Sequence, residues 1–130
     1  MEQQQINRPP DRVVWFEIPA ADLDRAVRFY ETLLDMKMKL GDHGPSRIAV
    51  FPYEEPATSG CVMDGPGMTP APGGVVAYLN ASPSLDAVVA RVKAAGGELV
   101  HPRTELPSGM GAYAKIRDTE GNIVGLHALA

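Results

Sequence analysis

Residues 13–34 read VVWFEIPAADLDRAVRFYETLL, a strand-like run followed by a helix-like run. The first run is rich in β-branched and aromatic residues, and its alternation presents Trp15 and Glu17 on one face of a predicted strand. From Leu23 onward the apolar residues recur at the spacing of an amphipathic helix, and Asp22 supplies a carboxylate to cap it. The stretch therefore predicts a strand that leads directly into a helix.

The second half of the chain repeats this order. Residues 75–80 form another strand-like run, and Ser82-Pro83 predicts an N-cap followed by proline at the first helical position. Leu85, which stands 62 residues after Leu23, begins a second apolar stripe that stops at the glycine pair 96–97. We therefore expect two similar halves.

The remaining strands complete the same pattern in both halves. They are predicted at residues 47–51 and 61–63, then at 98–101, 111–117 and 123–129, with a loop at 41–46 and a hairpin turn at 118–122. We interpret both halves as a strand–helix–strand–strand–strand unit, of which the first half shows two of the three strands after its helix. This repeat predicts an α+β fold with modules at 11–72 and 73–130. We expect one domain over residues 1–130, with residues 1–10 as a flexible N-terminus. One half cannot bury its helix stripe and its sheet face alone, so the halves should pack together or exchange with a second chain. A generic α+β domain whose halves resemble each other by chance is the alternative.

Composition limits the classes of function. Hydrophobic residues make up 45% of the 130 residues and charged residues 22%, which is typical of a soluble globular domain. The net charge of −4 and the lack of a basic cluster argue against a nucleic-acid partner. No stretch reaches the roughly 20 apolar residues that span a bilayer, so we expect no membrane partner. The single cysteine, Cys61, excludes an internal disulfide and suits a reducing compartment, and the polar N-terminus lacks the apolar core of a signal peptide. We expect a cytoplasmic protein.

Motifs in both halves resemble one known superfamily. The first is WFEIP at 15–19 followed by DLDRAVRFY at 22–30, and the second half adds AGG at 95–97, GAYA at 111–114 and DTEGNIVGLH at 118–127. This order of motifs over residues 13–128 resembles the vicinal oxygen chelate superfamily, which includes glyoxalase I, bleomycin-resistance proteins and extradiol dioxygenases. The chain looks most like its short members related to lactoylglutathione lyase. The resemblance implies two βαβββ modules that form an open cup.

The resemblance also implies where a metal ion would be held. In that superfamily the ligands come from the first and last strands of each module and are usually His, Gln or Glu. The matching positions here are Trp15, a position near Val76, Gly125, and the region 60–62, where Cys61 alone would not make a site. Indole, isopropyl and hydrogen cannot ligate such a cation. We therefore expect that the metal ligands have been lost and that no cofactor is bound.

Strand parity then predicts the residues that line the cup. Side chains two apart share a face, so Glu17 follows Trp15, Tyr78 follows Val76, and His127 follows Gly125. The resemblance to fosfomycin-resistance enzymes, which carry a substrate-contacting tyrosine at the matching position, places Lys115 in the cup with Tyr113. The predicted lining consists of Trp15, Glu17, Tyr78, Tyr113, Lys115 and His127.

Each of these residues also has a structural interpretation. Glu17 and His127 are the candidates for acid–base catalysis, but Glu17 could instead pair with Lys115 or Arg47, and His127 could be a core histidine. Trp15, Tyr78, Tyr113 and Lys115 are the candidates for ligand binding, although Trp15 could be a plain wall and Lys115 a solvated strand residue. The loops at 52–74 and 106–111 could border the site or merely connect strands.

Two functions follow from the lining. The first is a metal-independent protein that binds a small organic ligand. The second is a metal-independent lyase, isomerase or hydrolase that uses Glu17 and His127 as acid and base. A scaffold with a vestigial cup is a third hypothesis. The resemblance implies a homodimer as well, since paired modules of this superfamily often associate.

Overall fold

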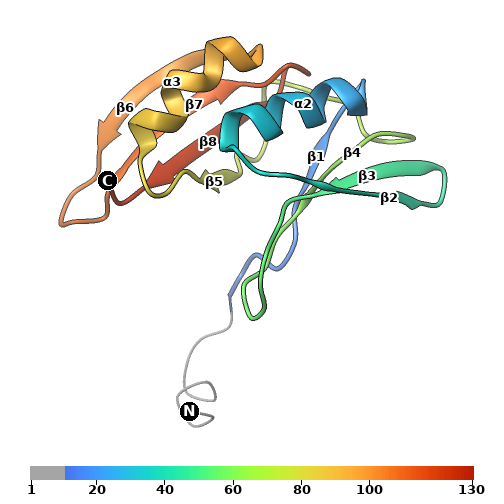
Figure 1. The fold of residues 1–130 in the computed structure, drawn as a ribbon, viewed down its shortest axis with the longest axis horizontal. Coiled ribbons are helices and arrows are strands. Elements are labelled where there is room, and N and C mark those ends of the chain that lie inside the picture. Colours follow the sequence, from blue (N-terminus) through green and yellow to red (C-terminus); the bar gives the residue numbers. More distant parts are fainter. Residues whose placement is uncertain (1–10) are drawn as a thin grey trace, which may run out of the picture.

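Two four-stranded sheets and two helices make up residues 11–130, the part of the chain that the computed structural model describes (Figure 1). The predicted flexible N-terminus, residues 1–10, lies outside these described residues. The first sheet has the order β1-β4-β3-β2, with β1 at Glu17–Pro19, β2 at Lys39–His43, β3 at Ser46–Val50 and β4 at Cys61–Met63. The second has the order β5-β8-β7-β6, with β5 at Tyr78–Asn80, β6 at Glu98–Glu105, β7 at Ala112–Arg117 and β8 at Ile123–Ala128.

The two sheets have the same plan. In each one the first and last strands of the module are parallel neighbours, β1 with β4 and β5 with β8, and the other pairs are antiparallel. Glu17 pairs with Cys61 in the first sheet, and Tyr78 pairs with Gly125 at the same place in the second. The predicted α+β fold of two βαβββ modules is confirmed.

The two helices begin at polar caps. Helix α2, at Leu23–Leu34, starts where the carboxylate of Asp22 accepts a hydrogen bond from the Arg25 N–H at 3.1 Å, as predicted. Helix α3, at Leu85–Ala95, is capped by Ser84 instead of the predicted Ser82. The hydroxyl of Ser84 accepts from the backbone N–H of Ala87 at 3.2 Å.

The start of α3 is fixed by a contact that is remote in the sequence. The backbone N–H of Leu85 donates to the backbone oxygen of Ala130 at 2.9 Å, which holds the first turn at this residue. Two serines two residues apart are equivalent caps by residue type, so the sequence could not distinguish them. The end of α3 was predicted correctly, because Gly96 adopts the left-handed conformation with φ of 106°.

The helices lie next to each other on the same side of the molecule (Figure 1). Helix α2 packs on β3 and β4, and α3 packs on β6, β7 and β8, so one core runs through both modules. Aromatic rings fill its middle: Tyr30 meets Phe29 edge-on at 4.8 Å and Phe51 at 5.5 Å between ring centroids. Because α2 also packs against α3, the buried residues of the two modules form one hydrophobic core.

Several strands differ from their predicted bounds. Residues 41–46, predicted as a loop, contain the end of β2, a short turn and the start of β3. Every residue of β2 is exposed, so this strand lacks the alternation by which buried strands are recognised. β1 and β5 begin later than predicted, and Val13, Val14 and Val75 stay at the surface. β6 continues past its predicted end to Glu105, with irregular pairing around Pro102, which an edge strand tolerates.

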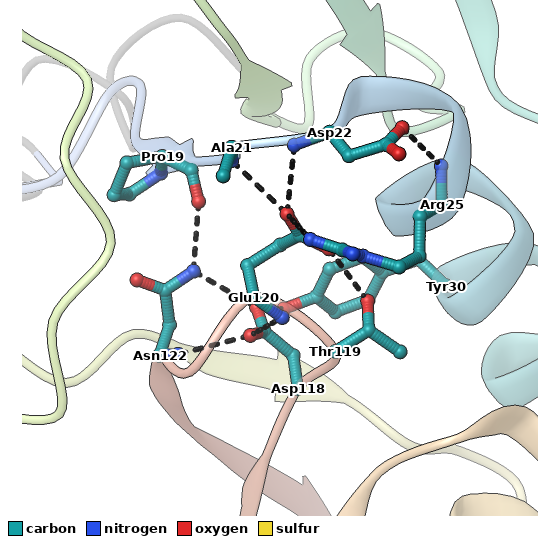
Figure 2. A network of polar contacts seen from close by, with 9 residues as sticks. All are labelled: Pro19, Ala21, Asp22, Arg25, Tyr30, Asp118, Thr119, Glu120 and Asn122. Carbon is teal, nitrogen blue, oxygen red and sulfur yellow. Dashed lines mark hydrogen bonds and ion pairs between the residues drawn. The ribbon is translucent and has the colours of Figure 1, made fainter.

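A polar network links the turn after β7 to the start of α2 (Figure 2). The carboxylate of Glu120 accepts hydrogen bonds from the backbone N–H groups of Ala21 at 3.0 Å and Asp22 at 2.9 Å. It also pairs with the guanidinium of Arg25, with Nε 2.8 Å from Oε2. Burial by itself would raise the pKa of Glu120, but these hydrogen bonds and the charge of Arg25 together lower it. The ionised carboxylate therefore holds the second module to the first.

Two neighbours of Glu120 extend the network into the core. The Tyr30 hydroxyl donates to Asp118 at 2.6 Å, and both residues are buried. Burial, followed by the negative charge of Asp118, raises the pKa of Tyr30 well above its usual value. The side chain of Asn122 donates to the Pro19 carbonyl at 2.8 Å and accepts from the Ala71 N–H at 3.2 Å. The turn at 118–122 is thus the polar joint between the modules.

Within residues 11–130, neither helix combines the length and the hydrophobicity that a membrane crossing requires.

Candidate functional site

The outer face of the second sheet carries most of the predicted cup residues. Along β7, Ala112, Ala114 and Ile116 are buried in the core, whereas Tyr113 and Lys115 point to the opposite face and are partly exposed. Strand pairing places these two side chains beside the residues of β8: Tyr113 pairs with His127, and Lys115 pairs with Gly125. The alternation that predicted this face is therefore observed.

A pocket of about 670 Å³ opens on this face. It is bordered by β5, β7 and β8 and by the loop before Gly111. Its lining residues are Tyr78, Leu79, Asn80, Ser82, Leu106, Tyr113, His127 and Leu129. Apolar side chains dominate, with a few polar groups among them, which is the usual composition of a site for a small organic molecule. We call this the β5–β8 pocket.

A row of three rings crosses the face beside the pocket. The imidazole of His101 on β6 stacks on Tyr113 at 5.3 Å with an interplanar angle of 7°. Tyr113 meets Tyr78 at 5.9 Å and 75°, an edge-to-face arrangement. Both geometries are favourable for aromatic pairs, so the row is an ordered apolar surface. Sequence patterns do not single out His101, because its place beside Tyr113 depends on the irregular pairing of β6.

Hydrogen bonds fix the tautomer of each histidine on this face. His127 Nε2 lies 2.7 Å from the carbonyl oxygen of Met110, and since a carbonyl can only accept, Nε2 carries the proton. His101 Nε2 lies 3.0 Å from the hydroxyl oxygen of Thr104, which donates its own proton to the Pro102 carbonyl at 3.0 Å. His101 Nε2 is therefore a donor as well. In each neutral ring, Nδ1 keeps the lone pair and accepts.

Asn80 is a pocket residue that the sequence analysis missed. It lies two residues after Tyr78 on β5 and pairs with His127 on β8, so the two side chains are neighbours on one face. Its Oδ1 accepts from the backbone N–H of Ser82 at 2.8 Å, which directs the amide nitrogen away from that contact. The parity argument that selected Tyr78 would also have selected Asn80.

Trp15 and Glu17, the other two predicted cup residues, are not at this pocket. Glu17 belongs to the first sheet, where it pairs with Cys61, and it borders a smaller hollow of about 190 Å³ between the modules. Trp15 precedes β1 and is 41% exposed. Arg47, a predicted structural partner of Glu17, instead contacts Asp24 at 3.5 Å and Asp64 at 3.4 Å.

The single six-residue cup of the sequence analysis is therefore divided. Tyr78, Tyr113 and His127 line one pocket, Lys115 shares their sheet face without lining it, and Trp15 and Glu17 lie on the other module. Parity decides on which face of its own sheet a side chain lies. It does not decide which residues of two separate sheets meet within one chain. Tyr78 and Asn80 share a second hollow with Phe16 of the first module, whereas Trp15 and Glu17 line neither this hollow nor the β5–β8 pocket.

The donors at the superfamily's metal positions do not fit a cation. A side chain at Gly125 would overlap the ring of Tyr78, so an aromatic ring fills the space that a ligating glutamate would need. Burial, followed by the nearby Glu17 carboxylate, raises the pKa of the Cys61 thiol to about 11, although a hydrogen bond from Trp15 opposes the shift. A thiol that stays protonated is a poor ligand. Across residues 11–130, no three or more His, Cys, Asp or Glu side chains are grouped so that they could hold a metal ion.

Comparison with known families agrees with the fold and the sequence motifs. The family model of the Glyoxalase/Bleomycin resistance protein/Dioxygenase superfamily matches residues 12–126. The chain belongs to this superfamily, and the predicted resemblance to the vicinal oxygen chelate proteins is confirmed. No curated protein sequence matches the chain significantly.

Solved structures show the same fold at low sequence identity. A variant of glyoxalase I from Zea mays is 21% identical with a TM-score of 0.68, and the match covers 92% of this chain but 47% of the maize protein. The chain thus spans about half the length of that enzyme. TnmS3, an antibiotic binding protein from Streptomyces sp. CB03234, is 23% identical with a TM-score of 0.67, over 94% of this chain and 98% of that protein. A glyoxalase/bleomycin resistance protein from Albidiferax ferrireducens is 18% identical with a TM-score of 0.68, over 91% and 98% of the two chains.

Proposed function

We propose that this protein binds a small organic ligand in the β5–β8 pocket without the help of a metal ion. The observation that carries the proposal is the ring of Tyr78 above Gly125, which puts an aromatic surface at the position that the resemblance assigns to a metal ligand. The superfamily metal ligands are lost, in this view, and the pocket has become an apolar site with polar groups at its edge. The structural similarity to an antibiotic binding protein supports binding as the function.

The first experiment separates binding from metal chemistry. Thermal unfolding would be recorded with zinc, nickel or manganese at increasing concentration. An ion that binds the native state stabilises it by mass action and raises the melting temperature. We expect no saturable rise, because the proposed site holds no ion. Stoichiometric stabilisation by one of these ions, removed by a chelator, would overturn the metal-independent function.

The second experiment locates the ligand. A fragment library would be screened by NMR on the wild type, on Tyr78→Ala and on Leu40→Ala. Leu40 lies on β2 of the first sheet, is 61% exposed and borders neither of the pockets that Tyr78 lines. Fragments should lose affinity in Tyr78→Ala and keep it in Leu40→Ala. Equal effects of the two substitutions would contradict binding at this pocket.

The catalytic alternative has less support. A lyase, isomerase or hydrolase that uses Glu17 and His127 needs both groups at one ligand, and within one chain Glu17 lies outside the pocket that His127 lines. The binding function requires no such convergence.

A homodimer is part of the proposal. Apolar side chains lie exposed near the edges of both sheets, among them Trp15 at 41%, Val75 at 98% and Leu129 at 74%. Such a surface is favourable for association. Light scattering should give twice the mass of the chain, and a monomer at all accessible concentrations would refute this part of the proposal.

A further inference from the structure

The polar edge of the β5–β8 pocket presents one acceptor and one donor side by side. His127 Nε2 is engaged with the Met110 carbonyl, which leaves Nδ1 of the neutral ring as an acceptor. Asn80 Oδ1 is engaged with the Ser82 N–H, and because a backbone N–H can only donate, the atom facing it must be the oxygen. The remaining amide nitrogen of Asn80 can only donate. Two local backbone contacts thus fix the polarity of two adjacent side chains.

These two side chains are close enough to contact one edge of a ligand. Asn80 and His127 are register partners on the parallel strands β5 and β8, and their side chains lie on the pocket face. Neighbouring strands are about 4.8 Å apart, so the Asn80 and His127 side chains can both reach polar groups of one small molecule by converging on it. Such a molecule must present a donor to His127 and an acceptor to Asn80.

The rest of the pocket selects for shape and charge. Tyr78 and Tyr113 offer aromatic surfaces at 5.9 Å and 75° to each other, and Leu106 and Leu129 add aliphatic walls. A flat ring system gains most from such surroundings. The lining includes no carboxylate, so nothing there would compensate a positive charge on the ligand.

We infer that the ligand is a flat, uncharged aromatic lactam whose ring N–H donates to His127 Nδ1 and whose adjacent C=O accepts from Asn80 Nδ2. The inference rests on the proposed binding function and adds the chemical class of the ligand. A lactam within a ring holds its N–H and C=O side by side in one plane, and neither group is used up by a bond within the molecule. It therefore matches both polar groups and the aromatic surface at once.

Three probes test the class. Quinolin-2-one has the ring, the N–H and the C=O, whereas its 1-methyl derivative lacks the donor and quinoline lacks the donor and the carbonyl. Dissociation constants would be measured by NMR titration. We expect quinolin-2-one to bind about five- to tenfold more tightly than the 1-methyl derivative, since one net hydrogen bond contributes on the order of 1 kcal/mol. The ratio is smaller than in a closed site because this pocket is open to water.

A substitution at Asn80 tests which side chain contacts the carbonyl. Asn80→Asp keeps an oxygen that can accept from Ser82, but it replaces the donor with a second acceptor. The wild type should bind quinolin-2-one more tightly than 2-aminoquinoline. The variant should reverse this order, because protonated 2-aminoquinoline presents two adjacent donors. His127→Phe should bring the affinities of quinolin-2-one and its 1-methyl derivative together. The readout is the ratio of affinities, because a variant that merely loosens the pocket lowers both together.

The outcomes separate this inference from the proposed function. Equal binding of all three probes, with loss of affinity in Tyr78→Ala, would overturn the lactam class and leave the binding function standing. If Asn80→Asp still bound quinolin-2-one more tightly than 2-aminoquinoline, as the wild type should, the inference would also be overturned. If none of the probes bound at Tyr78 and Tyr113, the lactam class would be wrong, and the fragment screen would decide separately whether the pocket binds anything.

Discussion

Tyr30 carries a hydroxyl group into the middle of the core, where it donates a hydrogen bond to Asp118 at 2.6 Å. Asp118 also accepts from the backbone N–H groups of Glu120 and Asn122 at 2.9 Å and from the Asn122 side chain at 3.0 Å. A buried carboxylate is tolerated only when its oxygens are satisfied in this way. The tyrosine is thus both a core residue and part of the joint between modules.

Replacement of Tyr30 by phenylalanine should destabilise the protein without changing its shape. The ring contacts with Phe29 and Phe51 remain, but Asp118 loses one of its hydrogen bonds, at a cost of about 1.5–3 kcal/mol in the free energy of unfolding. Urea denaturation measures the loss. Tyr53→Phe is the control: Tyr53 is 50% exposed, and we expect less than about 0.5 kcal/mol. Equal stability of Tyr30→Phe and the wild type would contradict a net contribution from this hydrogen bond.

The buried thiol of Cys61 should make the stability of the protein depend on pH in the alkaline range. Its pKa in the folded protein is raised from 9.0 to about 11, first by burial and then by the Glu17 carboxylate. The folded state therefore holds the thiol proton more tightly than the unfolded state, so the stabilisation is complete below pH 9 and is lost as the pH rises toward 11. The difference in unfolding free energy between the wild type and Cys61→Ala should shrink over that range. A difference that stayed constant would show that the thiol titrates equally in both states.

At the scale of elements, β5 and β8 decide the character of the pocket. Gly125 lies on β8 directly opposite Tyr78 on β5, and the absence of a side chain at Gly125 leaves room for the tyrosine ring. The first sheet places Glu17 opposite Cys61 at the corresponding positions. Two elements with the same topology therefore present an aromatic ring in one module and a carboxylate beside a thiol in the other.

The Gly125→Ala substitution tests this relation between the strands. The new methyl group would overlap the ring of Tyr78, so the ring must leave its place beside Tyr113. We expect a loss of about 1–3 kcal/mol in the free energy of unfolding, as for other overpacked sites. In a Tyr78→Ala background the same substitution should cost clearly less, because the overlapping ring is absent. Additive effects in this double-mutant cycle would mean that the strain arises elsewhere.

The sequence predicted those elements whose signal is periodic. The bounds of α2, the strand at 61–63 and the turn at 118–122 follow from apolar spacing and from residues typical of caps and turns. β2 was missed because all its residues are exposed, and the start of α3 was misplaced because a contact with Ala130 fixes it. Such features depend on pairing partners that are distant in the chain. Local patterns carry no information about them.

In the whole molecule, the distinction between local patterns and long-range contacts also explains which site residues were placed correctly. Parity placed Tyr78, Tyr113 and His127 on one face of the second sheet. This worked because β8, which carries His127, pairs with both β5 and β7, which carry the two tyrosines. It failed to separate Glu17 from them, because the relation between two sheets is set by the helix packing and by the joint at 118–122. The position of the modules relative to each other is therefore a property of the whole fold.

Glu120 is the residue on which this relation depends most directly. Its side chain is fully buried, and its carboxylate accepts from Ala21, Asp22 and Arg25 of the first module. Because these contacts lower its pKa in the folded state, the carboxylate stabilises the protein above its ordinary pKa near 4.5, and this contribution is lost as the pH falls through the lower folded value. The joint should therefore weaken in acid.

The Glu120→Gln substitution should remove about 1.5–3 kcal/mol from the free energy of unfolding at pH 7, because a neutral amide replaces an acceptor of charge-assisted hydrogen bonds. As the pH falls below 4.5 and through the lower folded pKa, the difference in unfolding free energy from the wild type should narrow, since the wild-type carboxylate becomes neutral too. Hydrogen exchange at the amides of Ala21 and Asp22 should be faster in the variant, because these groups lose a charged acceptor. Glu105→Gln is the matched control: Glu105 pairs with Arg103 at 2.7 Å within one module and its side chain is 70% exposed, so little stability should be lost. If Glu105→Gln and Glu120→Gln had the same effect, the joint between the modules would have to be held by the apolar core alone.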